Sequence, residues 1–136
     1  MSVAVERVGE LAGRPVHAFR LRDGSGFEAR VLDFGATLQS LRLPIDGGMR
    51  ELALGFRDFA DYPVKSPYFG ATVGRYANRI ANGRFALDGR VFELSRNENG
   101  RHTLHGGADN LAFRVWDAAP LPGGDGVRLG IRSPDG

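Results

Sequence analysis

The segment RHTLHGGADN, residues 101–110, sets His105 directly before two glycines and three residues after another histidine, His102. A neutral imidazole donates one hydrogen bond, accepts another, and is also a common metal ligand. Gly106 and Gly107 carry no Cβ atom, so the backbone can turn sharply there and leave room for a ligand beside His105. The segment therefore predicts proton-transfer or hydrogen-bonding chemistry at His105, or a metal site that uses both histidines.

The spacing of the two histidines favours separate roles over a shared metal ion. Residues three positions apart share one face of a helix, but on an extended segment they point to opposite sides. The flanking glycines disfavour a helix. The third histidine, His17, falls in an early predicted strand, and the chain has no cysteine to supply a thiolate. We therefore expect no bound metal.

Two further segments carry side chains that suit a saccharide. GRYANRI, residues 74–80, contains Asn78 and Arg79, and DYPVKSPYFG, residues 61–70, is rich in aromatic rings. Planar amide and guanidinium groups hydrogen-bond neighbouring hydroxyls, and an aromatic ring covers the apolar face of a sugar. Each segment also has a purely structural interpretation, since asparagine is common in turns and aromatic residues are common in cores.

The positions of glycine and proline predict the elements that hold these segments. Twenty glycines and seven prolines separate short stretches in which apolar residues alternate, a pattern typical of antiparallel all-β domains. The predicted strands are residues 15–22, 27–34, 37–44, 50–55, 114–119 and 126–132. Residues 56–70 are expected to form an irregular connection with one helical turn.

The segment RFALDGRVFEL, residues 84–94, predicts a β-hairpin that turns at Asp88 and Gly89. This turn places Arg84 opposite Glu93, and the charged pair lies on one face of the hairpin. The other face carries four apolar side chains, which we expect to be core: Phe85, Leu87, Phe92 and Leu94.

Composition disfavours several classes of partner. The net charge is +2, and the arginines, which make up all but one of the 18 basic residues, are spread along the chain. Nucleic-acid-binding proteins usually concentrate such residues on one face, so we expect no nucleic acid. No apolar run approaches the length of a membrane span, and the N-terminus lacks the pattern of a secretory signal. Together with the lack of cysteine, this favours a soluble, cytoplasmic protein.

The order of several motifs resembles the aldose 1-epimerase family, also called galactose mutarotases, from about residue 16 to 136. The motifs are FGATLQSLRLP, LALGF, YFGATVGRYANRIANGRFALDGRVFEL, LHGG and RVW. The resemblance implies an antiparallel β-sandwich of the galactose mutarotase type, which acts without a cofactor. It also implies interconversion of the α and β anomers of an aldose such as glucose or galactose, through acid–base opening of the sugar ring.

The resemblance also assigns roles to three residues. Asn78 and Arg79 match the family's substrate-holding pair, and His105 matches the histidine of the Leu-His-Gly-Gly motif. His105 is expected to bind and orient the sugar and to stabilise charge as the ring opens, with Arg79 assisting from the side. His102 stands where many relatives have asparagine, and is expected to be a variant loop residue.

In the family, the general acid, a second histidine, and the general base, a glutamate, follow the segment SPDG, here residues 133–136. His17 matches neither position, and nor do the glutamates: Glu6, Glu10, Glu28, Glu51, Glu93 and Glu98. We therefore expect residues 1–136 to be the N-terminal part of a single mutarotase-like domain, incomplete at its C-terminal side. Two alternatives remain open: a carbohydrate-binding module without turnover, and an inactive fragment.

The last predicted strand, residues 126–132, alternates strictly between apolar and other residues. Val127, Leu129 and Ile131 would share one side of an edge strand that has no partner beyond it. Exposed apolar edges promote pairing with another chain. We therefore expect the chain to self-associate through this edge.

Overall fold

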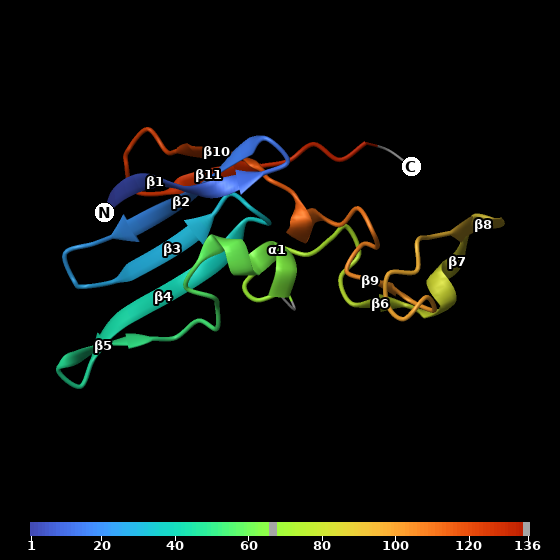
Figure 1. The fold of residues 1–136 in the computed structure, drawn as a ribbon, viewed down its shortest axis with the longest axis horizontal. Helices are drawn as coiled ribbons and strands as arrows, with labels where there is room; N and C mark the ends of the chain where they lie inside the picture. The colour runs from blue at the N-terminus through green and yellow to red at the C-terminus, as the bar shows by residue number, and fades with distance from the viewer. Residues whose placement is uncertain (66–67, 135–136) are drawn as a thin grey trace.

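The computed structural model describes residues 1–65 and 68–134 of the chain. Its largest element is a five-stranded antiparallel sheet in the order β1-β2-β3-β4-β5 (Figure 1). These strands are β1 (Ser2–Leu11), β2 (Arg14–Arg22), β3 (Glu28–Leu32), β4 (Thr37–Ile45) and β5 (Gly48–Glu51). Each strand pairs with the next along the chain, so the sheet is a meander.

Three two-stranded sheets complete the β-structure. They are β6 (Arg79–Ile80) with β9 (Thr103–Leu104), β7 (Arg84–Leu87) with β8 (Arg90–Glu93), and β10 (Asp117–Pro120) with β11 (Val127–Gly130). The helical elements are short: η1 (Phe59–Asp61), α1 (Tyr62–Lys65), η2 (Ala81–Gly83) and η3 (Leu111–Phe113). The predicted antiparallel all-β fold and the helical turn between residues 56 and 70 are confirmed. No helix in the described part of the chain is long and apolar enough to cross a membrane.

The bounds of one predicted strand were wrong, and the first strand of the sheet was not predicted. The strand predicted at 50–55 ends at Glu51, whose carboxylate accepts hydrogen bonds from the backbone N–H of Leu41 and Ala53 at 2.8 and 3.0 Å. The first strand, β1, was not predicted. Its pairing with β2 shifts at a bulge between Arg7 and Gly9, and a bulge interrupts the alternation on which strand prediction depends.

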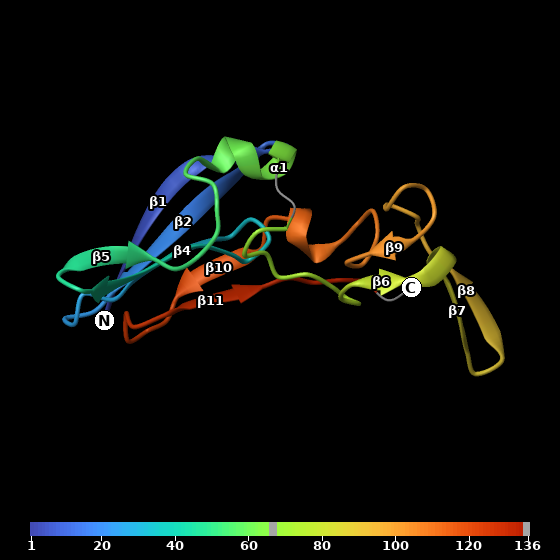
Figure 2. The same ribbon diagram turned by 90° about the horizontal axis from the view of Figure 1, so that it is seen from below.

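The core joins the five-stranded sheet to the helical segment. Val16, Ala18 and Leu32 of β2 and β3, and Phe34 in the turn after β3, pack with Phe59 and Tyr62 of η1 and α1, and with Val115. The ring of Phe34 meets that of Phe59 edge-on, with centroids 5.5 Å apart. The helical segment and the β10–β11 hairpin lie on opposite sides of β1 and β2 (Figure 2). The hairpin thus supplies a second β-layer.

Tyr62 connects the helical segment to the loop before it through a hydrogen bond. Replacing Tyr62 tests this part of the core. The side chain is 1% exposed, and its hydroxyl accepts the backbone N–H of Phe56 at 3.0 Å. We expect Tyr62→Phe to lower the free energy of unfolding by about 1–3 kcal/mol, because the N–H of Phe56 loses its partner. Urea denaturation measures this loss, and Tyr76→Phe is the matched control because Tyr76 is 59% exposed.

Tyr62 should also make the stability of the fold decrease at alkaline pH. Burial raises the pKa of the Tyr62 hydroxyl, against a hydrogen bond from Phe56 that lowers it. Its stabilisation is therefore fully present below the pKa of an exposed tyrosine and is lost as the pH rises through the higher folded-state pKa. The phenylalanine variant should lack this component of alkaline destabilisation, and an identical alkaline profile would contradict the assignment.

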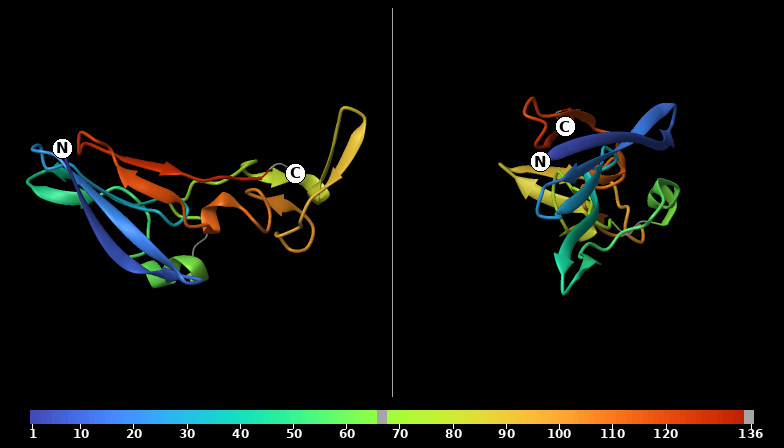
Figure 3. Two further views of the ribbon diagram at one scale, coloured as in Figure 1. Left: turned by 90° about the horizontal axis from the view of Figure 1, so that it is seen from above. Right: turned by 90° about the vertical axis from the view of Figure 1, so that its left-hand side faces the viewer.

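The β7–β8 hairpin has the predicted register but not the predicted burial. Arg84 pairs with Glu93 and Phe85 with Phe92, whose rings stack at 5.0 Å. However, Phe85, Leu87 and Phe92 are 38%, 57% and 41% exposed, so the prediction that this face is core was wrong. The hairpin, drawn yellow, projects from the end of the molecule remote from the five-stranded sheet (Figure 3). Alternation defines which residues share a face but not whether another element covers it.

The predicted last strand forms as β11, paired with β10. Val127 and Leu129 of this strand, and Ile131 just after it, are half-buried, not exposed. Among the described residues, the β7–β8 hairpin carries four exposed large apolar side chains: Phe85, Leu87, Val91 and Phe92.

Candidate active site

Asn78, Arg79 and His105 come together at the short sheet of β6 and β9. Arg79 pairs with Leu104 in this sheet. At its end, the N–H of His105 donates to the carbonyl oxygen of Asn78 at 2.9 Å, and the N–H of Asn78 donates to His105 Nδ1 at 3.0 Å. Asn78 and His105 both have positive φ, 62° and 51°, so the backbone turns at this end of both strands. The three predicted site residues are therefore adjacent in the structure.

The bond to Nδ1 decides what the His105 ring can do. Because Nδ1 accepts the N–H of Asn78, the neutral ring carries its proton on Nε2. The residue is half-buried, and its Nε2–H is the hydrogen-bond donor that the ring can offer to a ligand.

Tyr68 supplies an aromatic ring beside His105. Its ring meets the imidazole edge-on at 4.6 Å and the ring of Phe113 at 5.2 Å. Burial raises the pKa of the Tyr68 hydroxyl, against a hydrogen bond with Asn97 that lowers it. The aromatic segment predicted to form a wall thus contributes at least this residue, while its residues 66 and 67 lie outside the described part of the chain.

Arg79 is held by Glu98, a residue to which the sequence assigned no role. Arg79 Nε donates to Glu98 Oε2 at 2.7 Å and Nη2 donates to Oε1, while Nη1 donates to Asn78 Oδ1 at 3.1 Å. The hydrogen bond from Arg79 holds the pKa of Glu98 below its usual range, and Glu98 raises the pKa of Arg79. Three of the five N–H donors of the guanidinium are used in this way.

No sequence signal connected Glu98 with Arg79. The two residues are 19 positions apart, in a loop and a strand that no local pattern pairs. Their contact depends on how the loop from Asn97 folds over β6. Only a three-dimensional arrangement could have revealed it.

His102 has a separate, structural role, in agreement with its interpretation as a loop residue. Its Nδ1 accepts the backbone N–H of Asn82 in η2 at 3.0 Å. The rings of His102 and His105 therefore bind different backbone amides. Within residues 1–65 and 68–134, no group of three or more histidine, aspartate or glutamate side chains is arranged to hold a metal ion.

The two glycines after His105 allow other parts of the protein to approach closely, the backbone of residues 74–75 at Gly106 and the Ser95 side chain at Gly107. A Cβ on Gly106 would lie 2.5 Å from the carbonyl carbon of Gly74 and 2.9 Å from the nitrogen of Arg75, and one on Gly107 would collide with Ser95 Oγ. Both glycines have positive φ, 94° and 86°. The prediction that they leave room for a ligand therefore needs correction, because the chain itself fills that space.

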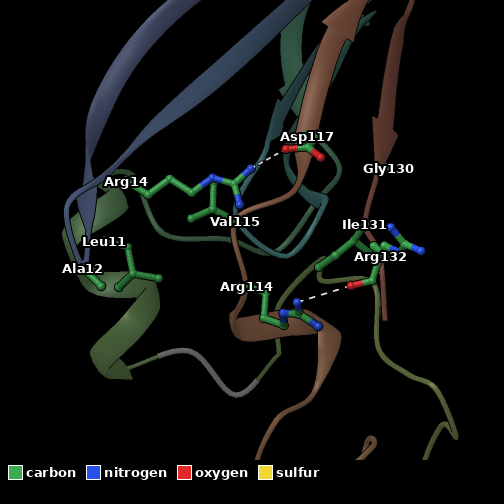
Figure 4. A pocket seen from close by; sticks show the side chains of 9 residues that line it. All are labelled: Leu11, Ala12, Arg14, Arg114, Val115, Asp117, Gly130, Ile131 and Arg132. Atoms are coloured by element: carbon green, nitrogen blue, oxygen red, sulfur yellow. Dashed lines mark hydrogen bonds and ion pairs between the residues drawn. The ribbon is translucent and has the colours of Figure 1, made fainter. Parts of the chain in front are cut away.

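A cavity of about 410 Å³ lies elsewhere, between the β1–β2 turn and the β10–β11 hairpin (Figure 4). Its polar groups contact one another: Arg14 Nη2 donates to Asp117 Oδ1 at 2.5 Å, and Arg114 Nη2 to the carbonyl oxygen of Arg132 at 3.4 Å. It includes none of the three predicted site residues. The side chains around His105 therefore lie outside this cavity.

Comparison with known proteins agrees with the motifs. The sequence model of the family described as aldose 1-epimerase matches residues 17–136. The chain is 39% identical to aldose 1-epimerase of Haemophilus influenzae over 91% of its own length and 35% of that protein's. It is 37% identical to galactose mutarotase of Rattus norvegicus over 100% of its length and 40% of that protein's.

A solved structure shows the same fold. The crystal structure of galactose 1-epimerase from Lactobacillus acidophilus superposes with a TM-score of 0.84 and 26% identity, over 99% of this chain and 40% of that one. The chain thus spans between 35 and 40% of the length of these three proteins. On the family match and the identities to these relatives, the chain belongs to the aldose 1-epimerase family.

Proposed function

We propose that the chain binds the ring form of an aldohexose, such as galactose or glucose, at Asn78, Arg79 and His105. The observation that carries this proposal is the pair of hydrogen bonds between Asn78 and His105, which leaves the Nε2–H of the imidazole as a positioned donor. The guanidinium of Arg79 lies on the same short sheet, and the ring of Tyr68 stands beside the imidazole. Donors next to an aromatic ring suit the hydroxyls and the apolar face of a sugar.

The reaction supported by the family membership is anomer interconversion. A base takes the proton of the C1 hydroxyl, an acid gives a proton to the ring oxygen, and the C1–O5 bond breaks to leave an open-chain aldehyde. Rotation about C1–C2 and the reverse proton transfers close the ring as the other anomer. His105 and Arg79 act here as donors that stabilise negative charge on the sugar oxygens as it develops.

We further propose that residues 1–136 are the N-terminal part of a single mutarotase-like domain, and that the acid and the base lie outside them. The chain's share of its relatives' length supports this division. The pairing of Glu98 with Arg79 also supports it, because the carboxylate of Glu98 is then not available as the base. No cofactor takes part in the proposed reaction.

Two measurements on one preparation test the proposal. Titration calorimetry with galactose should show saturable binding to the 136-residue chain, and polarimetry of freshly dissolved α-galactose follows mutarotation. We expect acceleration from a polypeptide of the relatives' length and little from the 136-residue chain. Acceleration by the 136-residue chain would place the acid and base within it, and the absence of any binding would contradict the proposed site.

A carbohydrate-binding role without turnover is the second candidate. It is favoured by the make-up of the site, in which the side chains around His105 are donors and aromatic rings, with the carboxylate of Glu98 already paired. Galactose binding without acceleration by any longer form of the protein would support it over catalysis.

Self-association is also proposed, through the exposed β7–β8 hairpin. Its free edges and its exposed side chains Leu87 and Val91, 57% and 51% exposed, favour pairing with a second copy. We expect Leu87→Lys to weaken association about tenfold, because a charge replaces apolar surface buried on pairing. Light scattering after size exclusion measures this, with Val64→Lys as the control on an 81% exposed residue of α1. A wild-type chain that remains monomeric at every concentration would contradict the proposal.

A further inference from the structure

We infer that Glu98 is a positioning residue of the sugar site, which holds the Arg79 guanidinium, and through it the Asn78 side chain, in the orientation that receives the sugar. This inference rests on the proposed function. It adds to the three predicted residues a fourth that does not itself touch the ligand.

The geometry of the Arg79–Glu98 pair identifies the anchor. Both carboxylate oxygens accept from the same guanidinium, through Nε and Nη2, and this fixes the plane of the group as well as its position. The Glu98 side chain is 17% exposed and that of Arg79 is 54% exposed. The carboxylate is therefore the shielded partner, and the guanidinium keeps an open side toward solvent.

A chain of hydrogen bonds connects Glu98 to His105 through Arg79 and Asn78. Arg79 Nη1 donates to Asn78 Oδ1 at 3.1 Å, and the peptide groups of Asn78 make both hydrogen bonds to His105. Asn78 has positive φ, a conformation that asparagine adopts more readily than most residues other than glycine. Without Glu98 the Arg79 guanidinium could change orientation, and its hydrogen bond to Asn78 would then be lost.

The backbone of Glu98 is itself held by hydrogen bonds within its loop. Its backbone exchanges two hydrogen bonds with His102, at 3.1 Å each, and its carbonyl oxygen also accepts the N–H of Arg101 at 3.0 Å. The ring of His102 is in turn bonded to Asn82 of η2. The anchor is thus in place before a ligand arrives, as a positioning residue requires.

A role for Glu98 as the general base is disfavoured by the same contacts. Its two oxygens are occupied by Arg79, and the hydrogen bond from that residue lowers the pKa of the carboxyl. A carboxylate stabilised in this way is a weak proton acceptor. Positioning is the role that fits both the geometry and the charge.

Three variants of the 136-residue chain test the inference: Glu98→Ala, Glu98→Gln and the control Glu93→Ala. Glu93 is also paired with arginines, Arg84 and Arg96, but on the hairpin. We expect the dissociation constant for galactose to rise about tenfold in Glu98→Ala and about threefold in Glu98→Gln, which keeps one acceptor oxygen. Glu93→Ala should stay within about twofold of the wild type.

A second readout needs no sugar. In nitrogen-15 spectra of the free protein, the Nε–H of Arg79 should give a distinct, slowly exchanging signal that Glu98→Ala abolishes and Glu98→Gln partly retains. The ring nitrogens of His105 should shift in Glu98→Ala but not in Glu93→Ala. If Glu98→Ala does not fold, Glu98→Gln decides the question with both readouts.

The two readouts separate failure of this inference from failure of the proposed function. If the wild-type chain does not bind galactose, the proposed function fails for this chain, while the spectra still show whether Glu98 orders Arg79 and His105. Unchanged Arg79 and His105 signals in both Glu98 variants would overturn the inference. An unchanged dissociation constant in Glu98→Ala would overturn it as well.

Discussion

Replacing His105 with alanine is expected to weaken galactose binding to the 136-residue chain by about tenfold, the effect of losing one well-positioned hydrogen bond. In any form of the protein that turns galactose over, we expect the rate constant to fall about 100-fold, because the lost donor faces charge that develops as the ring opens. Calorimetry measures the first effect and polarimetry the second.

The matched comparison is His102→Ala. That ring has the same kind of backbone bond, to Asn82 and not to Asn78. Its removal should weaken binding much less than the removal of His105. Equal losses of affinity in the two variants would contradict the assignment of sugar binding to His105.

Gly106→Ala is expected to lower the free energy of unfolding by about 3–5 kcal/mol, a larger loss than we expect for Tyr62→Phe. The new Cβ would lie 2.5 Å from the carbonyl carbon of Gly74, and the residue would keep a φ of 94°. Backbone atoms cannot move aside as a flexible side chain can. The segment that carries His105 must therefore shift away from residues 74–75.

Urea denaturation of Gly106→Ala and Gly100→Ala separates the steric effect from the backbone effect. Gly100 also has positive φ, 65°, but nothing lies within 4 Å of its would-be Cβ. Gly100→Ala should cost only about 1–2 kcal/mol, the penalty for a left-handed conformation. Equal losses in the two variants would show that residues 74–75 do not pack against Gly106.

Local rules accounted for the elements in which neighbours in sequence are neighbours in space. The Asp88–Gly89 turn predicts the register of its hairpin because a two-residue turn allows one pairing, and the structure has that pairing. The bulge near Arg7 shifts the alternation of β1, and so this strand was missed. The exposure of the hairpin was missed for a different reason, because burial depends on what another element covers.

The same distinction applies to the residues of the candidate site. Asn78, Arg79 and His105 could be selected because each lies in a short motif that resembles the aldose 1-epimerase family, and the β6–β9 pairing brings the two motifs together. Glu98 could not, since its role depends on a contact between segments 19 residues apart. Gly106 was selected for the right property, a missing Cβ, but the neighbour that uses the space is the protein backbone.

Binding of an aldose at the Nε2–H of His105 can be followed by titrating histidine-labelled chain with galactose and recording nitrogen-15 spectra. We expect the Nε2 signal of His105 to shift and saturate, with much smaller changes at His102 and His17. Saturable binding that leaves His105 unmoved, or that shifts all three histidines alike, would contradict the claim.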